Sequence, residues 1–370
     1  MGLRVLIIDD QADSVAPLID ELTQSLPESS CIVVAFGAAE ASLKSHDPHV
    51  VVLDLMQGTG ADATPDGLAT RAYIWGQKFC PLVIYTARPD AIEEGAAAGH
   101  PFFRVIQKGA ASEKGVLETI RTFEPHIAAL DDVSREIRWA MNGVLREIAP
   151  RVFERIPDEA ERRVTLVRSA RRRVAARMDE DLSTGEPGLK TWEFYLCPPV
   201  VDKHLLTGDI LRQRDGDKNT ASSYRVVLTP SCDLVQSGTR QPKVKQVLVA
   251  TCCGVKKLLD ELQLSGIAQW KDSQRKRLTS ALNQGHSQSC LPLPELPGEF
   301  PSMVADLRDL QLLALTDIGP DKDWVRIASV DNPLRELTAW AYVGLAARPG
   351  LPDRDFDAWV SEMIAAEAKG

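Results

Sequence analysis

The segment His49–Met56, with the sequence HVVVLDLM, constrains the fold of this chain more than any other. Its run of valines and a leucine is typical of a central parallel strand whose two faces are both covered by helices. Asp54 follows this run directly, so its side chain is expected in the crevice above the sheet, where open α/β sheets bind ligands. The alternative is an aspartate that only ends the strand and caps the next segment. The neighbouring segments decide between the two.

Strands and helices alternate along residues 1–124. Apolar strands are expected at Leu3–Ile8, Cys31–Ala35, His49–Leu53, Pro81–Thr86 and Phe102–Gln107. Helices are expected between and after them, at Ser14–Leu26, Ala38–Lys44, Gly67–Gln77, Asp90–Ala98 and Ser112–Phe123. This alternation predicts an α/β domain with a doubly wound, five-stranded parallel sheet.

Polar side chains stand at the carboxyl ends of four of these strands: Asp9 and Asp10, Asp54, Thr86 and Lys108. Because these ends share one edge of a parallel sheet, we expect the side chains to converge. Neighbouring carboxylates repel one another unless a divalent cation neutralises them, and Mg²⁺ suits oxygen ligands. We therefore predict a Mg²⁺ site made by the three aspartates, with the backbone carbonyl of Met56 as a further ligand.

Asp54 is the predicted nucleophile of this site. A lone carboxylate attacks a phosphoryl group poorly, but Mg²⁺ and Lys108 would stabilise the developing charge, so that an aspartyl phosphate can form. The Thr86 hydroxyl would then donate a hydrogen bond to the new phosphoryl group and draw its loop inward.

An acidic pair after the first strand, Asp54 after the third, Thr86 at the end of the fourth and Lys108 after the fifth together resemble the receiver domain of two-component response regulators. The resemblance covers about a third of the chain. It implies a flavodoxin-like fold, with Asp54 as phosphoacceptor and Asp9 and Asp10 as metal ligands. It also implies a histidine kinase or a phosphotransfer protein as the phosphoryl donor and partner.

Three features depart from the pattern of that family. Gly109 stands where receivers usually have proline, and Val105 where they usually have tyrosine or phenylalanine. Residues Gly58–Ala63 are inserted beside the site. We expect the aspartyl chemistry to be intact, with the inserted loop as an alternative to the usual threonine-to-aromatic switch.

Residues 125–182 are predicted to form a helical connector. Apolar residues recur at three- and four-residue steps, as in a heptad seam, at Ile127, Leu130, Ile137, Met141, Val144 and Ile148. Pro150 is expected to end or kink this helix, and a similar seam continues through Ala160, Val164, Val167, Val174 and Met178. The two stripes pack either against a second copy, forming a homodimer through residues 127–178, or against each other as a helical hairpin.

Arginines crowd the second connector helix from Arg162 to Arg177. One interpretation is a solvated face whose arginines pair with nearby acids. The other is a phosphate-binding surface for nucleic acid or a nucleotide.

Residues 185–370 are predicted to form an α+β output domain with a small β-barrel, after a break at Gly185–Gly188. Strands are expected at Thr191–Leu196, Asp209–Gln213, Tyr224–Thr229 and Val244–Thr251, followed by helices and a Pro-rich surface loop at Pro292–Pro301. The strand order loosely resembles the SH3-like barrels of toxin–antitoxin ribonucleases. That resemblance carries over no catalytic residue.

Several cysteines and histidines of this domain allow a zinc site or a thiol nucleophile to be drawn, although packing is the default interpretation. They are Cys232, Cys252, Cys253 and Cys290, with His204 and His286. Their spacing matches no standard zinc motif.

The chain of 370 residues has a net charge of −9, which argues against a wholly basic nucleic-acid coat. No signal peptide and no apolar run long enough to span a bilayer is visible, so no membrane partner is expected, and the cysteines are interpreted as reduced thiols of a cytoplasmic protein. We therefore predict a phosphorylation-controlled regulator whose output domain binds a partner. The alternative is a receiver-controlled nuclease or nucleic-acid-binding protein.

Overall fold

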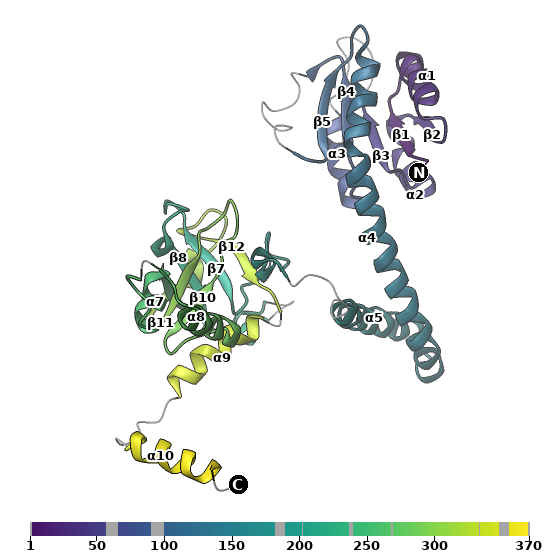
Figure 1. Ribbon diagram of the computed structural model, residues 1–370. Coiled ribbons are helices and arrows are strands. Elements are labelled where there is room, and N and C mark those ends of the chain that lie inside the picture. The colour runs from purple at the N-terminus through teal and green to yellow at the C-terminus, as the bar shows by residue number, and fades with distance from the viewer. Residues whose placement is uncertain are drawn as a thin grey trace. The chain divides into compact units, whose positions relative to one another are not determined.

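The computed structural model describes residues 2–56, 66–89, 100–181, 189–201, 203–236, 240–267, 269–332, 334–347 and 355–368. The chain forms two compact units, Met1–Glu186 and Pro187–Gly370, and each is described by itself (Figure 1). The insertion at residues 58–63, the helix predicted at 90–98 and the break predicted at 185–188 lie outside the described residues.

The N-terminal unit contains a five-stranded parallel sheet in the order β2-β1-β3-β4-β5. Its strands are β1 (Arg4–Ile8), β2 (Ser30–Val34), β3 (Val50–Leu53), β4 (Leu82–Thr86) and β5 (Phe103–Gln107). Every residue of the central strand β3 is buried, as its run of valines predicted. This sheet confirms the predicted doubly wound fold of the first part of the chain.

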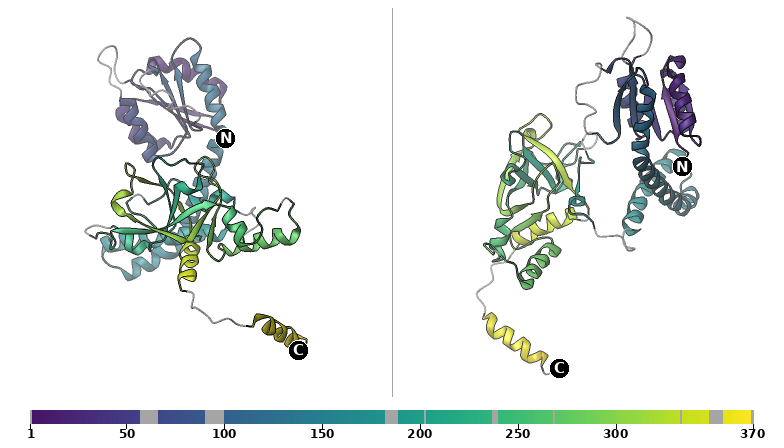
Figure 2. Two further views of the ribbon diagram at one scale, coloured as in Figure 1. Left: turned by 90° about the vertical axis from the view of Figure 1, so that its left-hand side faces the viewer. Right: turned by 45° about the horizontal axis from the view of Figure 1, so that its top comes forward.

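Helices cover both faces of this sheet (Figures 1 and 2). They are α1 (Ala16–Ser25), α2 (Ala39–His46), α3 (Asp66–Gln77) and the first part of α4 (Ser112–Arg155). Val5 and Ile7 of β1 pack in one core with α1 and α4, whereas Leu6 and Ile8 pack in the other with α2 and α3. Alternate strand residues therefore supply two separate cores. Short 3₁₀ turns at Ala12–Val15 and Phe36–Ala38 precede α1 and α2.

Helix α4 is longer than the sequence suggested. It runs unbroken from Ser112 to Arg155, through Pro125 and Pro150. The prediction that one helix ends at Phe123 is therefore wrong. Pro150 was expected to end or kink the next helix, and it does not end it. Proline removes one helical hydrogen bond, but burial of Phe123 and Ile127 on either side of Pro125 stabilises the helix through that position.

The connector forms a hairpin within one chain. Helix α5 (Glu159–Asp181) follows α4 after a short turn and packs back on it. Their shared core consists of Ala140, Val144, Ile148, Ala170 and Val174. Of the two alternatives for the apolar seams, the structure contains the hairpin. The second seam is shifted, because Val164 and Val167 are exposed whereas Leu166 and Ala170 pack inward.

The C-terminal unit is built on a seven-stranded antiparallel sheet in the order β10-β11-β9-β8-β7-β12-β6. Its strands are β6 (Tyr195–Leu196), β7 (Asp209–Gln213), β8 (Tyr224–Val227), β9 (Gln246–Gly254), β10 (Cys290–Leu293), β11 (Met303–Ala314) and β12 (Trp324–Val330). Among the described residues the edge strands β6 and β10 are not paired with each other. The separate antiparallel sheet domain agrees with the predicted fold class, and the small barrel stays a prediction.

Helices of the C-terminal unit are α6 (Ser231–Leu234), α7 (Lys256–Glu261), α8 (Asp272–Gln284), α9 (Leu334–Ala346) and α10 (Phe356–Glu367). Short 3₁₀ turns lie at Thr191–Phe194, Ala221–Ser223 and Leu315–Asp317. Two local predictions need correction. Thr191–Phe194 is a 3₁₀ turn rather than strand, and the predicted Pro-rich loop begins inside strand β10. Pro292 is tolerated there because an edge strand donates on one side only. Within the described ranges, no helix is long and apolar enough to cross a membrane.

Candidate functional site

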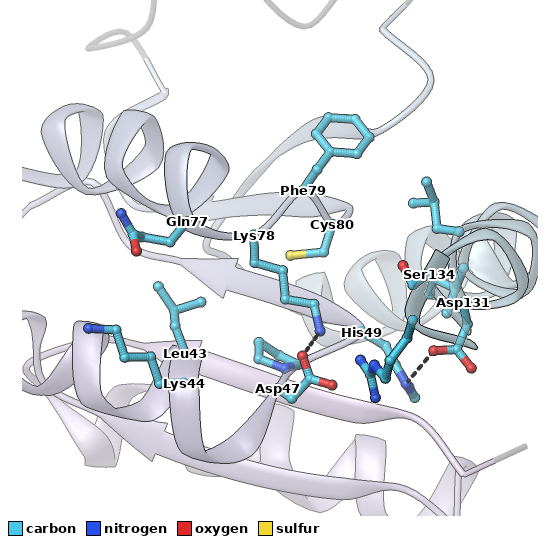
Figure 3. A pocket seen from close by; sticks show the side chains of 14 residues that line it. Leu43, Lys44, Asp47, His49, Gln77, Lys78, Phe79, Cys80, Asp131 and Ser134 are labelled. Atoms are coloured by element: carbon cyan, nitrogen blue, oxygen red, sulfur yellow. Dashed lines mark hydrogen bonds and ion pairs between the residues drawn. The ribbon is translucent and has the colours of Figure 1, made fainter. Parts of the chain in front are cut away.

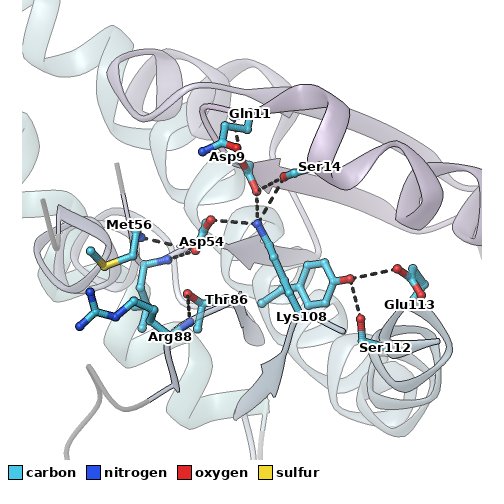
Figure 4. A network of polar contacts seen from close by, with 12 residues as sticks. Asp9, Gln11, Ser14, Asp54, Met56, Thr86, Arg88, Lys108, Ser112 and Glu113 are labelled. Carbon is cyan, nitrogen blue, oxygen red and sulfur yellow. Dashed lines mark hydrogen bonds and ion pairs between the residues drawn. The ribbon is translucent and has the colours of Figure 1, made fainter. Parts of the chain in front are cut away.

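Three of the predicted site residues meet at the carboxyl edge of the parallel sheet (Figure 4). Asp9 follows β1, Asp54 follows β3 and Lys108 follows β5. The Lys108 ammonium donates to Asp9 Oδ2 at 2.7 Å and to Asp54 Oδ2 at 2.9 Å. One cation therefore joins the tips of three different strands.

Each carboxylate is also fixed by its own loop. Asp54 Oδ1 accepts hydrogen bonds from the Leu55 amide at 2.6 Å and the Met56 amide at 3.4 Å. Asp9 Oδ1 accepts from the Gln11 amide at 2.8 Å, and Asp9 is almost fully buried. Because backbone donors hold one oxygen of each carboxylate, the other oxygens are turned toward Lys108.

Lys108 is held as a charged group. Burial lowers the pKa of its ammonium, but hydrogen bonds from it to Asp9 and Asp54 outweigh burial and raise the pKa above its usual value. Lys108, which hydrogen-bonds to two carboxylates, is therefore positively charged throughout the neutral pH range.

Thr86 and Tyr85 end strand β4 and point to opposite faces of the sheet, as successive strand residues do. Thr86 is fully buried, and its Oγ1 accepts from the Arg88 amide at 3.2 Å. The Tyr85 hydroxyl lies 2.8 Å from Ser112 Oγ and donates to Glu113 Oε1 at 3.3 Å. Lys108 Nζ lies 5.5 Å from the centre of the Tyr85 ring. The carboxyl edge is thereby connected to the first turn of α4.

Two contributors to this network were not identified from the sequence. Ser14 Oγ donates to Asp9 Oδ2 at 3.2 Å and accepts from Lys108 at 3.4 Å. Tyr85 was assigned only to a strand. Their positions in the sequence could have identified them, because Ser14 lies one helical turn past the acidic pair and Tyr85 directly precedes the predicted site residue Thr86.

The donor set fits Mg²⁺ in its chemistry, since Asp9 and Asp54 present carboxylate oxygens that already share one positive charge. Asp10 is half-buried beside Asp9, and the Met56 peptide borders Asp54. No group of three or more His, Cys, Asp or Glu side chains among the described residues is arranged to hold a metal ion. The site formed by Asp9, Asp10, Asp54 and the Met56 carbonyl therefore stays a prediction.

Comparisons with protein-family models and with curated proteins give no match. Solved structures are similar to the N-terminal part of the chain. The response regulator PhyR from Brucella abortus is 20% identical over 36% of this chain and 52% of that chain, with a TM-score of 0.29. The receiver (REC) domain of PhyR from Erythrobacter litoralis is 21% identical over 32% of this chain and 90% of that chain, with a TM-score of 0.26.

A further structure, of the PhyR stress response regulator, is 26% identical over 34% of this chain and 47% of that chain, with a TM-score of 0.27. The match thus spans about half the length of the longer PhyR structures, 52% and 47% of them.

A cavity of about 360 Å³ with mixed polar and apolar walls lies at the amino ends of the strands, away from Asp54 (Figure 3). His49 Nδ1 accepts from the Arg4 amide at 3.2 Å, so a neutral His49 carries its proton on Nε2. That nitrogen lies 4.0 Å from Asp131 Oδ1 on α4. Burial lowers the pKa of His49, which keeps the ring neutral at neutral pH. His49 was predicted only as the start of a strand.

Some of the arginines of helix α5 contact α4 and so stabilise the α4–α5 hairpin. Arg173 and Arg177 pair with Glu147 of α4 at 3.6 and 3.3 Å. Arg162 and Arg177 lie over the rings of Phe153 and Trp139. Arg163, Arg168, Arg171 and Arg172 are exposed. Nucleic-acid binding by Arg162–Arg177 stays a prediction.

The cysteines of the C-terminal unit do not form a cluster in the described part of the chain. Cys252 belongs to the core of the sheet, and burial raises the pKa of its thiol. Burial and the neighbouring Glu261 raise the pKa of Cys290 to about 12. Cys232 is exposed beside Asp233. Buried, protonated thiols such as Cys252 and Cys290 are poor nucleophiles and poor zinc ligands.

Proposed function

We propose that the chain is a phosphorylation-controlled response regulator in which Asp54 accepts a phosphoryl group. The observation that supports this most is the Lys108 ammonium between Asp9 and Asp54. This arrangement places a carboxylate nucleophile, at the tip of the central strand, next to a fixed cation. Such a pair stabilises the negative charge that develops on a transferred phosphoryl group.

In the proposed step an Asp54 carboxylate oxygen attacks the phosphorus of a phosphohistidine. The new O–P bond forms as the P–N bond breaks, and the leaving imidazole keeps the electron pair. Lys108 lies within hydrogen-bond distance of Asp54, so it is placed to bind an oxygen of the phosphoryl group. Mg²⁺, when bound by Asp9, Asp10, Asp54 and the Met56 carbonyl, would neutralise phosphoryl charge. The donor is a histidine kinase or a phosphotransfer protein.

Helix α4 is proposed to carry the change away from the site. Phosphorylation converts the free Asp54 carboxylate, to which Lys108 is hydrogen-bonded, into an acyl phosphate. Thr86, at the carboxyl end of the neighbouring strand β4, would donate a hydrogen bond from its hydroxyl to the new phosphoryl group. Tyr85, beside Thr86, contacts Ser112 and Glu113 in the first turn of α4. A continuous helix from there to Arg155 connects the site to the α4–α5 hairpin. The C-terminal unit is then the output, binding a partner.

Phosphodonor labelling tests this proposal. The full-length wild type, incubated with labelled acetyl phosphate and Mg²⁺, is expected to incorporate an acid-stable, base-labile label. Asp54→Asn is expected to abolish the label, and Lys108→Ala to reduce the rate at least tenfold, because the fixed cation is lost. Chelation of Mg²⁺ is expected to reduce it as well.

Asp20→Asn is the matched control, because Asp20 is an exposed carboxylate on α1. It should label as the wild type does. A label that persists in Asp54→Asn would refute Asp54 as the acceptor, and unchanged labelling after chelation would refute the Mg²⁺ site.

A further inference from the structure

The C-terminal helix α10 carries an apolar stripe. Phe356, Trp359, Val360, Met363 and Ile364 recur at three- and four-residue steps, which places them on one face. Phe356, Met363 and Ile364 are each more than 60% exposed, and no residue of this fully described helix is buried. An isolated helix of this length is marginal in water, so such a stripe is stabilised when it is buried against another surface.

A groove of the same character lies on the body of the C-terminal unit. Its volume is about 700 Å³, and its walls come from α7, α8, β10, β11, the segment before β6, the start of α9 and Trp270, which precedes α8. Leu258, Leu278, Leu282, Leu293 and Met303 are among the apolar residues that line it. Leu282 is about half exposed. Amphipathic helices commonly bind apolar grooves of this kind through residues at positions i, i+3, i+4 and i+7.

We propose that the apolar stripe of α10 docks into this groove of its own chain. The charges of α10 and of the groove favour α10 as the helix that binds there. Between Phe356 and Glu367 the helix contains Asp357, Glu362 and Glu367 and no basic residue, which disfavours an anionic membrane surface. The groove carries Lys190 on its wall. Arg275 precedes Leu278 and Leu282 by three and seven residues and so shares their face of α8.

The chain is long enough for this docking. The groove includes Leu334, the first residue of α9, and α9 ends at Ala346, about 18 Å along the helix. Phe356 follows Ala346 by ten positions, which can span about 33 Å when extended. A tether of this length gives an effective concentration on the order of mM. The own-chain helix is therefore favoured over a second copy at ordinary protein concentrations.

Hydrogen exchange of the full-length protein tests the docking, and it does not depend on the function proposed for Asp54. In the wild type, α10 amides are expected to exchange at least tenfold more slowly than in Leu282→Asp, which places a charge on the half-exposed wall of the groove. Asn283→Asp is the matched control: it adds the same charge at the next, exposed position of α8 and should leave α10 as protected as in the wild type.

Equal exchange of α10 in the wild type and Leu282→Asp would overturn the proposal, provided that β9 and β11 amides show both proteins to be folded. Protection of α10 should also be unchanged on tenfold dilution. Protection that is lost on dilution would show docking into a second copy and would overturn the own-chain assignment. A reciprocal variant, Met363→Asp, is expected to release α10 without touching the groove.

Discussion

Lys108 holds together two carboxylates that would otherwise repel each other. Asp9 and Asp54 come from strands that are neighbours in the sheet, and each is turned toward the ammonium by backbone amides. The types and order of these residues could be predicted, because parallel strands bring their carboxyl ends to one edge. The bond from Ser14 to Asp9 could not, because it depends on a 3₁₀ turn before α1.

His49 gives the N-terminal unit a pH dependence. Burial lowers its pKa in the folded chain below the unfolded value of about 6.5. The unfolded chain therefore binds the proton more readily, so the free energy of unfolding should decrease as the pH falls from about 7 to about 5. In His49→Gln this decrease should be smaller. Urea denaturation of both proteins at the two pH values measures the difference.

His126→Gln is the control for that measurement, since His126 is exposed on α4. It should keep the pH dependence of the wild type. An equal pH dependence in His49→Gln and the wild type would show that His49 does not titrate differently on folding.

At the scale of elements, α4 shows where sequence patterns mislead. One helix was expected to end at Phe123, and Pro150 was expected to end or kink the next. The helix instead continues because its buried face packs first on the sheet, through Phe123 and Ile127, and then on α5, through Val144 and Ile148. The heptad spacing correctly predicted the Val144–Ile148 face. It could not decide between a hairpin and a dimer, because both bury the same stripe.

A pair of substitutions in α4 tests the hairpin. Val144 is buried against α5, whereas Val133 is 53% exposed on the same helix. Val144→Asp should lower the free energy of unfolding by about 3 kcal/mol, because a buried carboxylate without a partner is costly. Val133→Asp should change it by about 0.5 kcal/mol or less. Denaturation followed by far-UV circular dichroism measures both.

The outcome also separates the two interpretations of the seam. A dimer through residues 127–178 in place of the hairpin would make the stability of both variants depend on protein concentration. A concentration-independent loss in Val144→Asp alone is expected for the hairpin.

At the scale of the whole molecule, the C-terminal unit contains a buried ion pair. Asp209 is fully buried and accepts hydrogen bonds from Ser329 Oγ at 2.5 Å, the Leu206 amide at 2.8 Å and Arg326 at 3.3 Å. Burial raises the pKa of Asp209, and these donors oppose the rise. Arg326→Met removes the cation and should destabilise this unit by about 3–5 kcal/mol.

Because the chain forms two compact units, this loss should be confined to one of them. Calorimetry of Arg326→Met is expected to lower one unfolding transition, and phosphodonor labelling of Asp54 should be unaffected. Arg308→Met, at an exposed position of β11, is the control and should behave as the wild type. A parallel fall of both transitions would contradict separate units.

The strand order of the second unit could not be predicted from the sequence. The segment Asp209–Gln213 was placed correctly, because its apolar pair Ile210 and Leu211 lies between turn residues, Gly208 before it and Asp215-Gly216 after it. Its pairing with β12, more than a hundred residues later, depends on long-range packing. In the first unit, by contrast, short alternating elements leave few possible topologies.

Because α4 is uninterrupted, its length also fixes the angle about the helix axis at which the hairpin faces relative to the parallel sheet. Each added residue turns a helix by about 100°, so an insertion of two residues between Val133 and Trp139 would rotate the hairpin by about 200° relative to the sheet. An insertion of seven would return it to within about 20° of its original azimuth. Signalling that depends on the direction in which the hairpin faces should therefore survive the insertion of seven residues and fail after the insertion of two.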